Sequence, residues 1–306
     1  MTPALPDSIR VVVRGWLNSN QVVLRAPGEN VVVDSGYSSH REKTLELLAA
    51  ALDREPLERL VNTHCHTDHI GGNAAIASVY GCRVTIPEGE VKNVEPWTPQ
   101  SVWMREFDQR ADPFRFDDTI AAGAAFAGGG FEWHAHAAPG HDMDALVFFE
   151  PSNRILISGD ALWRDGMGLV WPVEGANPFI EAARETLAVI ERLGPAIVIP
   201  GHGEPFSEVA AAIAGVRSRL EALAADPARN ARHVAKVLFV FALLERGSMR
   251  AEEVPAYLAS VPCYGELSGR FLGLEPPALA DLILGDLARA GALSVRDGIV
   301  RPSMAA

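Results

Sequence analysis

This sequence predicts an α/β fold in which helices cover sheets on their outer faces, followed by a small helical domain. Short valine-rich runs alternate with helices and many glycines as far as residue 215, and beyond it the pattern is almost wholly helical. The charge changes at the same place: residues 1–215 hold 16 basic and 29 acidic side chains, while residues 216–306 hold 11 and 10. We therefore expect two domains, residues 1–215 and residues 216–306, which a chain of 306 residues can accommodate.

The elements expected in the first domain follow from spacing along the chain. Valine-rich runs separated by turn residues predict neighbouring antiparallel strands at residues 9–16, 21–25 and 30–34. Leucines at near-helical spacing predict a helix over residues 41–52, and a buried strand over 57–62 then leads into a histidine-rich segment. The Ala/Gly-rich residues 121–130 are expected to form a loop or a close-packed turn. The other expected elements are helices ending near residue 80 and spanning 178–193, and strands over 83–86, 131–138, 145–149, 154–158 and 196–200.

The overall composition excludes several classes of protein. Hydrophobic residues make up 48% of the chain and charged residues 22%, which excludes a disordered chain. The net charge of −12 argues against a primary role on DNA or RNA, whose binding needs positive charge. Three scattered cysteines favour a reducing compartment, and no secretory signal is visible. The longest apolar stretch, residues 237–244, is too short for a membrane span, so we expect a soluble, cytoplasmic protein.

Four metal-competent side chains occur within six residues, in the segment His64-x-His66-x-Asp68-His69. His64 and His66 face the same side of an extended segment because side chains alternate with a period of two. A turn after His66 can then bring Asp68 and His69 to an adjacent position. Imidazole and carboxylate together suit Zn, Mn or Fe(II) better than Ca or Mg, which prefer oxygen ligands. Cys65 points to the opposite face, where we expect a small buried side chain.

Three later residues have the same character, because His141, Asp160 and His202 each follow an apolar strand and a glycine. Glycine lets the backbone turn tightly and bring the next side chain to the edge of a sheet. One such histidine is usually a packing or surface residue. Seven metal-competent residues in this order and context are improbable by chance, so we predict that they form one metal centre.

The pattern resembles the metallo-β-lactamase superfamily of binuclear metallohydrolases, over about residues 9–206. The resemblance implies an αββα four-layer sandwich with two divalent metal ions between the sheets, and a structural role for Asp34. Zn is the expected metal, with Fe or Mn as alternatives. One departure from the family pattern is Asp142-Met143-Asp144 after His141, where many relatives carry a small hydroxyl residue. We expect the carboxylate of Asp142 to face solvent rather than to change the hydrogen bonding of the metal ligand. The implied ligands are His64, His66 and His141 for the first ion, Asp68, His69 and His202 for the second, and Asp160 bridging both.

Such a centre is suited to hydrolysis. Two divalent ions about 3.5–4 Å apart lower the pKa of a shared water and hold the resulting bridging hydroxide as nucleophile. Asp68 is expected to orient this nucleophile and then help to deliver a proton to the leaving group, which makes it the catalytic candidate. No Gly-x-Ser-x-Gly elbow is present, which argues against serine chemistry.

The substrate is less clearly indicated, and a small thioester, ester or lactone is favoured. Residues 63–73 resemble hydroxyacylglutathione hydrolases, but the chain has only three lysines to meet the carboxylates of glutathione. The aromatic residues 87–118 either wall the cleft or pack as an ordinary long loop. The alternatives are a phosphodiesterase or nuclease, which the acidic balance of residues 1–215 disfavours, and a non-catalytic metal-binding sensor or interaction protein. The candidate pocket residues are Tyr37, Trp103, Trp163 and Trp171.

The C-terminal domain is predicted to hold three helices, over residues 231–247, 250–259 and 277–290, and a hairpin around Asp297-Gly298. This order resembles a winged-helix domain, which some superfamily hydrolases carry at this end. The last helix carries Asp281 and Asp286 against Arg289 alone, a poor match for nucleic-acid phosphate. Packing, formation of a homodimer or covering of the active-site cleft is therefore favoured for this domain.

Overall fold

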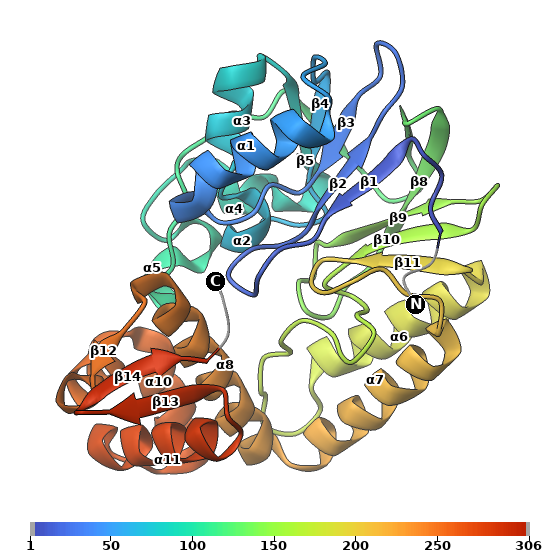
Figure 1. The fold of residues 1–306 in the computed structure, drawn as a ribbon. Helices are drawn as coiled ribbons and strands as arrows, with labels where there is room; N and C mark the ends of the chain where they lie inside the picture. Colours follow the sequence, from blue (N-terminus) through green and yellow to red (C-terminus); the bar gives the residue numbers. More distant parts are fainter. Residues whose placement is uncertain (1–3, 304–306) are drawn as a thin grey trace.

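Two β-sheets lie face to face between layers of helices in the computed structural model, which describes residues 4–303 (Figure 1). Alternate side chains of both sheets fill the space between them, among them Val22, Leu24, Trp133 and Phe148. The intervening Val23 points to the other face of its sheet and packs with helices instead. This alternation follows from the period of two along a strand. The predicted αββα sandwich is confirmed.

The first sheet has six strands in sequence order. Its first three strands pair antiparallel, and every pair from β3 to β6 is parallel. The strands are Ile9–Val12 (β1), Gln21–Leu24 (β2), Val31–Val33 (β3), Arg59–Val61 (β4), Arg83–Pro87 (β5) and Asp118–Ile120 (β6). Parallel pairing of β3 with β4 brings their carboxyl ends to one edge of the sheet, where Asp34 and the histidine-rich segment begin.

The second sheet has the order β11-β10-β9-β8-β7, with β10 and β11 parallel and the other pairs antiparallel. Its strands are Ala125–Gly128 (β7), Phe131–Ala137 (β8), Leu146–Glu150 (β9), Ile155–Gly159 (β10) and Ile197–Pro200 (β11). The edge strand β7 lies in residues 121–130, where a loop or turn was expected. Phe126 explains the difference, because it pairs with Trp133 and buries its side chain between the sheets.

Helices cover the outer faces of both sheets (Figure 1). On the first sheet these are α1 (Arg41–Ala51) and α3 (Asn73–Tyr80). On the second they are α6 (Pro178–Leu193), whose cap residue Asn177 accepts two backbone N–H bonds, and α7 (Val209–Ala225). No helix was expected at α7, which runs through residue 215 and shares a hydrophobic core with α6. Shorter helices are η1 (Ser38–His40), α2 (Thr67–Ile70), η2 (Glu88–Glu90), α4 (Val91–Val94), η3 (Ser101–Trp103) and α5 (Met104–Phe107).

The C-terminal unit has its own core, which begins at Ala231. A small sheet of order β12-β14-β13 completes it, and the expected hairpin is confirmed at Asp297-Gly298, where both residues have positive φ as a tight turn requires. None of the helices in residues 4–303 combines the length and the apolar character that crossing a bilayer requires. The elements are α8 (Pro227–Arg246), β12 (Met249–Arg250), η4 (Ala251–Glu253), α9 (Val254–Ser260), α10 (Pro262–Leu267), η5 (Ser268–Leu272), α11 (Pro276–Arg289), β13 (Leu293–Arg296) and β14 (Ile299–Pro302).

Candidate metal centre

The seven ligand candidates converge at one edge of the sandwich, on loops and a short helix that follow strands. β4 leads into the first four, β8 precedes the loop with His141, and β10 and β11 end next to Asp160 and His202. They fall into two groups, and within each group one ligand atom per residue lies within 4.8 Å of all the others. The groups are His64, His66 and His141, and Asp68, His69, Asp160 and His202.

The carboxylate of Asp160 lies between the two groups. Its Oδ2 is 3.5 Å from Nε2 of His141, which belongs to the first group. Its Oδ1 is 3.3 Å from Nε2 of His69 and 3.7 Å from Nε2 of His202, which belong to the second. One side chain therefore offers an oxygen to each group, which is the arrangement that bridging two cations requires.

A backbone contact orients the first group. Nδ1 of His141 donates to the carbonyl oxygen of Leu169 at 2.6 Å, which leaves a lone pair on Nε2. That Nε2 lies 2.8 Å from Nδ1 of His66 and can accept a hydrogen bond from it, so these two ring nitrogens face each other. A hydrogen bond that fixes the tautomer of a histidine in this way is typical of metal ligands.

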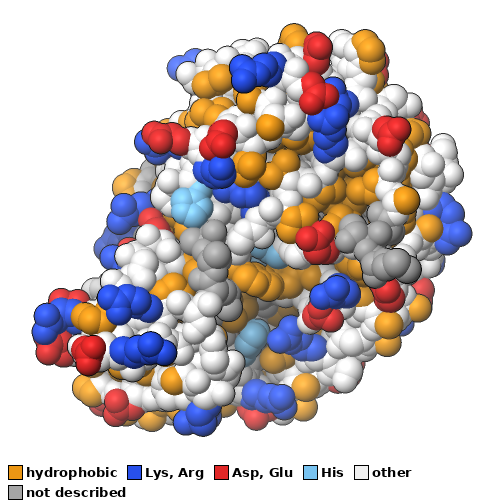
Figure 2. Space-filling model, in the orientation of Figure 1, with side chains coloured by type: hydrophobic (Ala, Val, Ile, Leu, Met, Phe, Trp, Pro, Cys, Tyr) orange, Lys and Arg blue, Asp and Glu red, His pale blue; other side chains and the backbone are white. Residues whose placement is uncertain are grey.

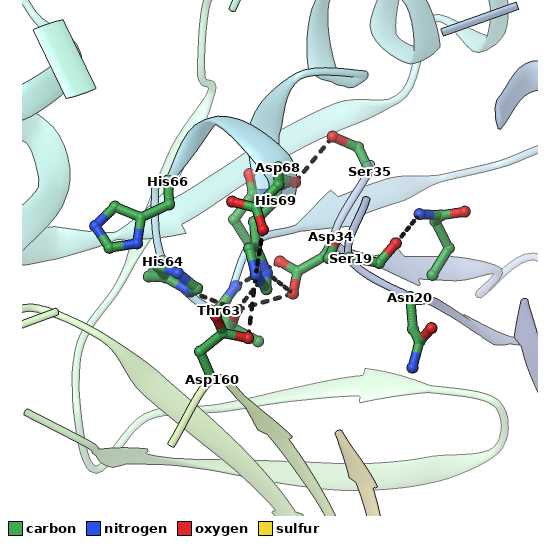
Figure 3. A network of polar contacts seen from close by, with 12 residues as sticks. Ser19, Asn20, Asp34, Ser35, Thr63, His64, His66, Asp68, His69 and Asp160 are labelled. Atoms are coloured by element: carbon green, nitrogen blue, oxygen red, sulfur yellow. Dashed lines mark hydrogen bonds and ion pairs between the residues drawn. The ribbon is translucent and has the colours of Figure 1, made fainter. Parts of the chain in front are cut away.

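Asp34 orients the remaining histidines of the segment (Figure 3). Its Oδ2 accepts hydrogen bonds from Nδ1 of His69 and from the Thr63 hydroxyl, both at 2.8 Å. The Thr63 oxygen can in turn accept from Nδ1 of His64, 3.1 Å away. Nε2 of His64 and Nε2 of His69 are then buried without a hydrogen-bond partner among residues 4–303. Buried polar atoms rarely lack a hydrogen-bond partner in folded proteins. Two imidazole nitrogens in this situation are suited to binding a metal ion.

Most of these ligand candidates have protonation states that suit metal binding, whereas His69 must first lose a proton: burial disfavours its charged form, but the carboxylates of Asp34, Asp160 and Asp68 outweigh burial and raise its pKa well above the ordinary value. Burial lowers the pKa of His64 well below its ordinary value and that of His66 to about 4, so both imidazoles are neutral at pH 7. Burial opposes ionisation of Asp160, but His69 and His202 outweigh it and hold the pKa of that carboxyl well below its usual range. Neutral imidazoles and ionised carboxylates are the forms in which these side chains bind cations.

Two glycines allow the ligands to approach this closely. A Cβ atom on Gly201 would lie 2.4 Å from Oδ1 of Asp160, and one on Gly168 would lie 2.4 Å from Cγ of His141. Any larger residue would displace the carboxylate or the imidazole. The glycine before His202 is therefore required by the space that Asp160 occupies.

Asp142 is buried beside the centre, so the expectation that it faces solvent was wrong. It is 4% exposed, and its Oδ2 lies 3.5 Å from Nε2 of His66. Glu90, in η2, packs against it and accepts the backbone N–H of Cys65, which is buried as expected. Burial, and then the charge of Asp142, raise the pKa of Glu90 to about 8, so this carboxyl keeps its proton at pH 7. The loop after His141 folds against η2, a contact that no local pattern shows.

A cavity of about 630 Å³ opens onto the two groups of ligands. The C-terminal unit forms part of its wall, since α8 supplies Val237, Leu238 and Phe241 and α10 supplies Cys263 and Glu266. Figure 2 shows hydrophobic side chains exposed in the hollow beside this unit. The C-terminal unit therefore both packs against the sandwich and forms a wall of the cleft, which are two of the arrangements expected for it.

Three of the four predicted pocket residues, Trp103, Trp163 and Trp171, lie on the cavity wall, and Trp103 shows that residues 87–118 contribute to it. The indole N–H of Trp163 also donates to Oδ1 of Asp160 at 3.2 Å. Trp16 was not among the predicted pocket residues, yet it lines the cavity, and its ring stacks on His202 with centroids 5.3 Å apart. Its position at the end of the expected strand 9–16 gave no signal of this contact.

Tyr37, the fourth predicted pocket residue, lies elsewhere. Its side chain is fully buried, and its hydroxyl donates to Glu245 at 2.9 Å and accepts the backbone N–H of Arg110 at 2.8 Å. Tyr37 therefore joins the sandwich to α8 and does not face the cavity. The prediction was wrong because a position after a strand end indicates proximity to the site but not the direction of the side chain.

Comparison with known proteins agrees with this geometry. The family model described as the metallo-beta-lactamase superfamily matches residues 14–202. A hydroxyacylglutathione hydrolase of Rhodopseudomonas palustris is 30% identical over 135 residues, which are 44% of this chain and 45% of that protein. A probable metallo-hydrolase of Methanocaldococcus jannaschii is 25% identical over 203 residues, or 63% of this chain and 91% of that protein. The chain thus spans about half the length of the hydroxyacylglutathione hydrolases that it matches.

The fold of a solved structure extends the likeness through the C-terminal unit. A metallo-beta-lactamase family protein from Thermus thermophilus aligns with a TM-score of 0.56 at 21% identity, covering 98% of this chain and 100% of that one. At this identity the likeness concerns the fold alone. The family match extends over more than half of the sequence and includes every ligand candidate from His64 to His202. The chain belongs to the metallo-β-lactamase superfamily.

Proposed function

We propose that this protein is a metal-dependent hydrolase of small thioesters, esters or lactones. The observation that carries the proposal is the position of Asp160, which presents one carboxylate oxygen to each of two groups of buried ligands. Two divalent ions held there would activate water and polarise a carbonyl oxygen. We propose Zn, with Fe and Mn as the alternatives that mixed nitrogen and oxygen donors accept. His64, His66 and His141 would hold the first ion, Asp68, His69 and His202 the second, and Asp160 both.

Asp68 is the proposed proton carrier. Its Oδ2 lies 3.1 Å from Nε2 of His202, and its side chain also lines the cavity. The carboxylate therefore contacts a ligand and the space in which a substrate would lie. From this position it can hold a proton during attack on the carbonyl and pass it to the leaving group.

The lining of the cavity indicates the substrate class. Aromatic and aliphatic side chains from both units supply apolar surface. Charged groups on the wall are mainly carboxylates, namely Glu106, Asp142, Asp144 and Glu266, and the ammonium of Lys92 is paired with Asp144 at 2.7 Å. Such a wall repels negative charge close to the reacting carbonyl. This supports an apolar acyl group and weighs against a thioester of glutathione.

The same wall disfavours the alternative of a phosphodiesterase or nuclease, since a nucleic-acid strand brings a negative charge with every nucleotide.

We propose a winged-helix-like arrangement for the C-terminal unit, because a helix, a strand, further helices and a hairpin follow one another in it. Its proposed role is to cover the substrate, because α8 and α10 line the cavity. In place of the expected boundary at residue 215, which would divide α7, we propose a boundary at Asp226, between the end of α7 and the start of α8.

Elemental analysis coupled to a substrate screen tests the proposal. The protein is stripped with a chelator and reloaded, and turnover of thioesters, lactones and phosphodiesters is measured for each metal. We expect two ions per chain and turnover of thioesters or lactones that His66→Ala and Asp160→Asn abolish. The partly exposed His134 provides the control, because His134→Ala removes an imidazole outside the centre. Turnover of phosphodiesters alone would support the nuclease, and two bound ions without turnover would support the non-catalytic alternative.

A further inference from the structure

A second cavity, of about 640 Å³, lies where α7 meets α8, outside the metal centre. Ser218 contributes a hydroxyl to its lining, and Asp286 contributes the one carboxylate. Five basic side chains surround these groups, in a protein whose net charge is −12. They are Arg219, Arg229, Arg232, His233 and Lys236.

Asp286 does not neutralise this cavity. Arg232 and Lys236 both bind it, at 2.5 and 3.2 Å, so the three groups together keep a positive charge. Arg219 and Arg229 are exposed and form no ion pair with any residue between 4 and 303. Burial, and to a smaller extent the charges of Arg219, Lys236 and Arg229, lower the pKa of His233 to about 4, so this imidazole is neutral at pH 7 and the positive charge comes from the arginines and Lys236. The cavity therefore keeps a net positive charge, which Asp286 alone does not balance.

One face of α8 connects this basic cavity to the cavity of the metal centre. His233 lines the first, and Val237 and Phe241 line the second. Residues four apart lie on the same face of a helix, and the eight residues from His233 to Phe241 span about 12 Å. Val237 lies between His233 and Phe241 on this face of α8, and it is 37% exposed, so it offers apolar surface between the two cavities.

The loop after Asp160 borders both cavities as well. A Cβ atom on Gly166 would lie 2.7 Å from Nη1 of Arg219, so the guanidinium rests against this loop. Trp163, in the same loop, lines the metal-centre cavity. A long ligand that lies along α8 would therefore contact the arginines at one end and the ligands of the metal centre at the other.

We propose that the basic cavity binds the phosphate groups of a nucleotide, and that this nucleotide ends the leaving group of the substrate, as in an acyl thioester of coenzyme A. Guanidinium groups bind phosphate oxygens in pairs, and the acidic wall near the metal centre requires that these charges lie far from the reacting carbonyl. Hydrolysis would break the carbon–sulfur bond, add the hydroxyl of water to the acyl carbon and transfer the remaining proton of that water to the leaving thiolate, which departs as a thiol. This inference rests on the proposed hydrolase function.

Calorimetric titration of ADP into the metal-loaded protein tests the site. Arg219→Ala/Arg229→Ala removes two cations that no acid of the described chain holds in place, so the fold should tolerate the change. We expect it to weaken ADP binding by about tenfold or more, because charge-assisted hydrogen bonds are lost. The control is Arg83→Ala/Arg217→Ala, which removes the same charge from exposed ion pairs elsewhere. Absence of ADP binding, or binding that the first variant leaves unchanged, would overturn the site.

Turnover of two thioesters with the same acyl group identifies the source of the nucleotide. An acyl-coenzyme A is compared with the acyl thioester of N-acetylcysteamine, which lacks the nucleotide. We expect a preference for the coenzyme A thioester of about tenfold or more, which the Arg219→Ala/Arg229→Ala variant loses through a higher KM at unchanged kcat. Equal turnover of the two would overturn the assignment to the leaving group and assign the site to a separate nucleotide.

Two further outcomes keep this inference distinct from the proposed function. Turnover of the short thioester by the variant would show that the hydrolase function stands whether or not the basic cavity binds nucleotide. An RNA oligonucleotide that binds through the same two arginines and is cleaved would overturn the inference in favour of a nucleic-acid substrate.

Discussion

Replacing Glu90 by glutamine tests the buried carboxyl pair beside His66. Glu90 is fully buried against Asp142, and burial together with the charge of Asp142 raises its pKa to about 8. In the unfolded chain the pKa of a glutamate is about 4.3. Between these two values the folded protein holds one proton more than the unfolded chain at this residue. The contribution of Glu90 to stability is therefore complete below about pH 4 and is lost as the pH rises through 8.

The size of this effect follows from proton linkage. One extra bound proton in the folded state lowers the free energy of unfolding by about 1.4 kcal/mol for each unit of rising pH. Between pH 5.5 and 7.5 the loss from Glu90 amounts to about 3 kcal/mol. Glutamine stays neutral, keeps an oxygen for the backbone N–H of Cys65 and can donate to Asp142, while the amide of Asn93, which donates to Oε2 of Glu90, can rotate to offer its oxygen instead. The Glu90→Gln variant should match the wild type at pH 5.5 and exceed its stability by about 3 kcal/mol at pH 7.5.

Urea denaturation at pH 5.5, 6.5 and 7.5, followed by tryptophan fluorescence, measures this difference. Chelator-treated protein is used, so that no bound cation adds to the electrostatic field at Glu90. The control is Glu88→Gln, because Glu88 is an exposed neighbour in the same short helix. If the unfolding free energies of Glu90→Gln and the wild type change with pH in parallel, the protonated carboxyl pair is refuted.

Three other variants act on the contacts of the metal centre. Trp163→Phe keeps the ring against His202 but removes the hydrogen bond to Asp160, so kcat should fall by about tenfold with both ions retained. Asp34→Asn weakens the acceptor that orients His69, and competition with a chelator should show metal affinity reduced by about 10- to 100-fold. Gly201→Ala places a methyl group against Asp160, so elemental analysis should find fewer than two ions per chain and turnover should be lost.

Matched controls separate these effects from general damage. Trp97→Phe changes a tryptophan that packs against Phe114 and is not part of the cavity lining, Asp165→Asn removes an exposed carboxylate, and Gly215→Ala adds a methyl group where no atom lies within 4 Å. All three should keep two ions and the kcat of the wild type. Equal losses in a variant and its control would contradict the role assigned to that contact.

Most strand positions of the sandwich and the seven ligand candidates could be predicted from the sequence, because both depend on local features, whereas the edge strands β6 and β7 were not predicted. Valine-rich runs, leucine spacing and glycines at strand ends determine backbone shape over a few residues. Asp160 and His202 each follow a strand and a glycine, so their places at the sheet edge required no knowledge of distant contacts. Parallel pairing of β10 with β11 then brings these strand ends together.

The directions and surroundings of other side chains were decided by tertiary packing alone. Asp142 is buried because η2 lies against its loop, Tyr37 points toward Glu245 of α8, and Trp16 stacks on a histidine 186 positions later in the chain. The wall that the C-terminal unit adds to the cavity also joins residues far apart in the sequence. Burial and side-chain contact depend on which surface packs opposite, and the spacing of residues within one segment does not specify that surface.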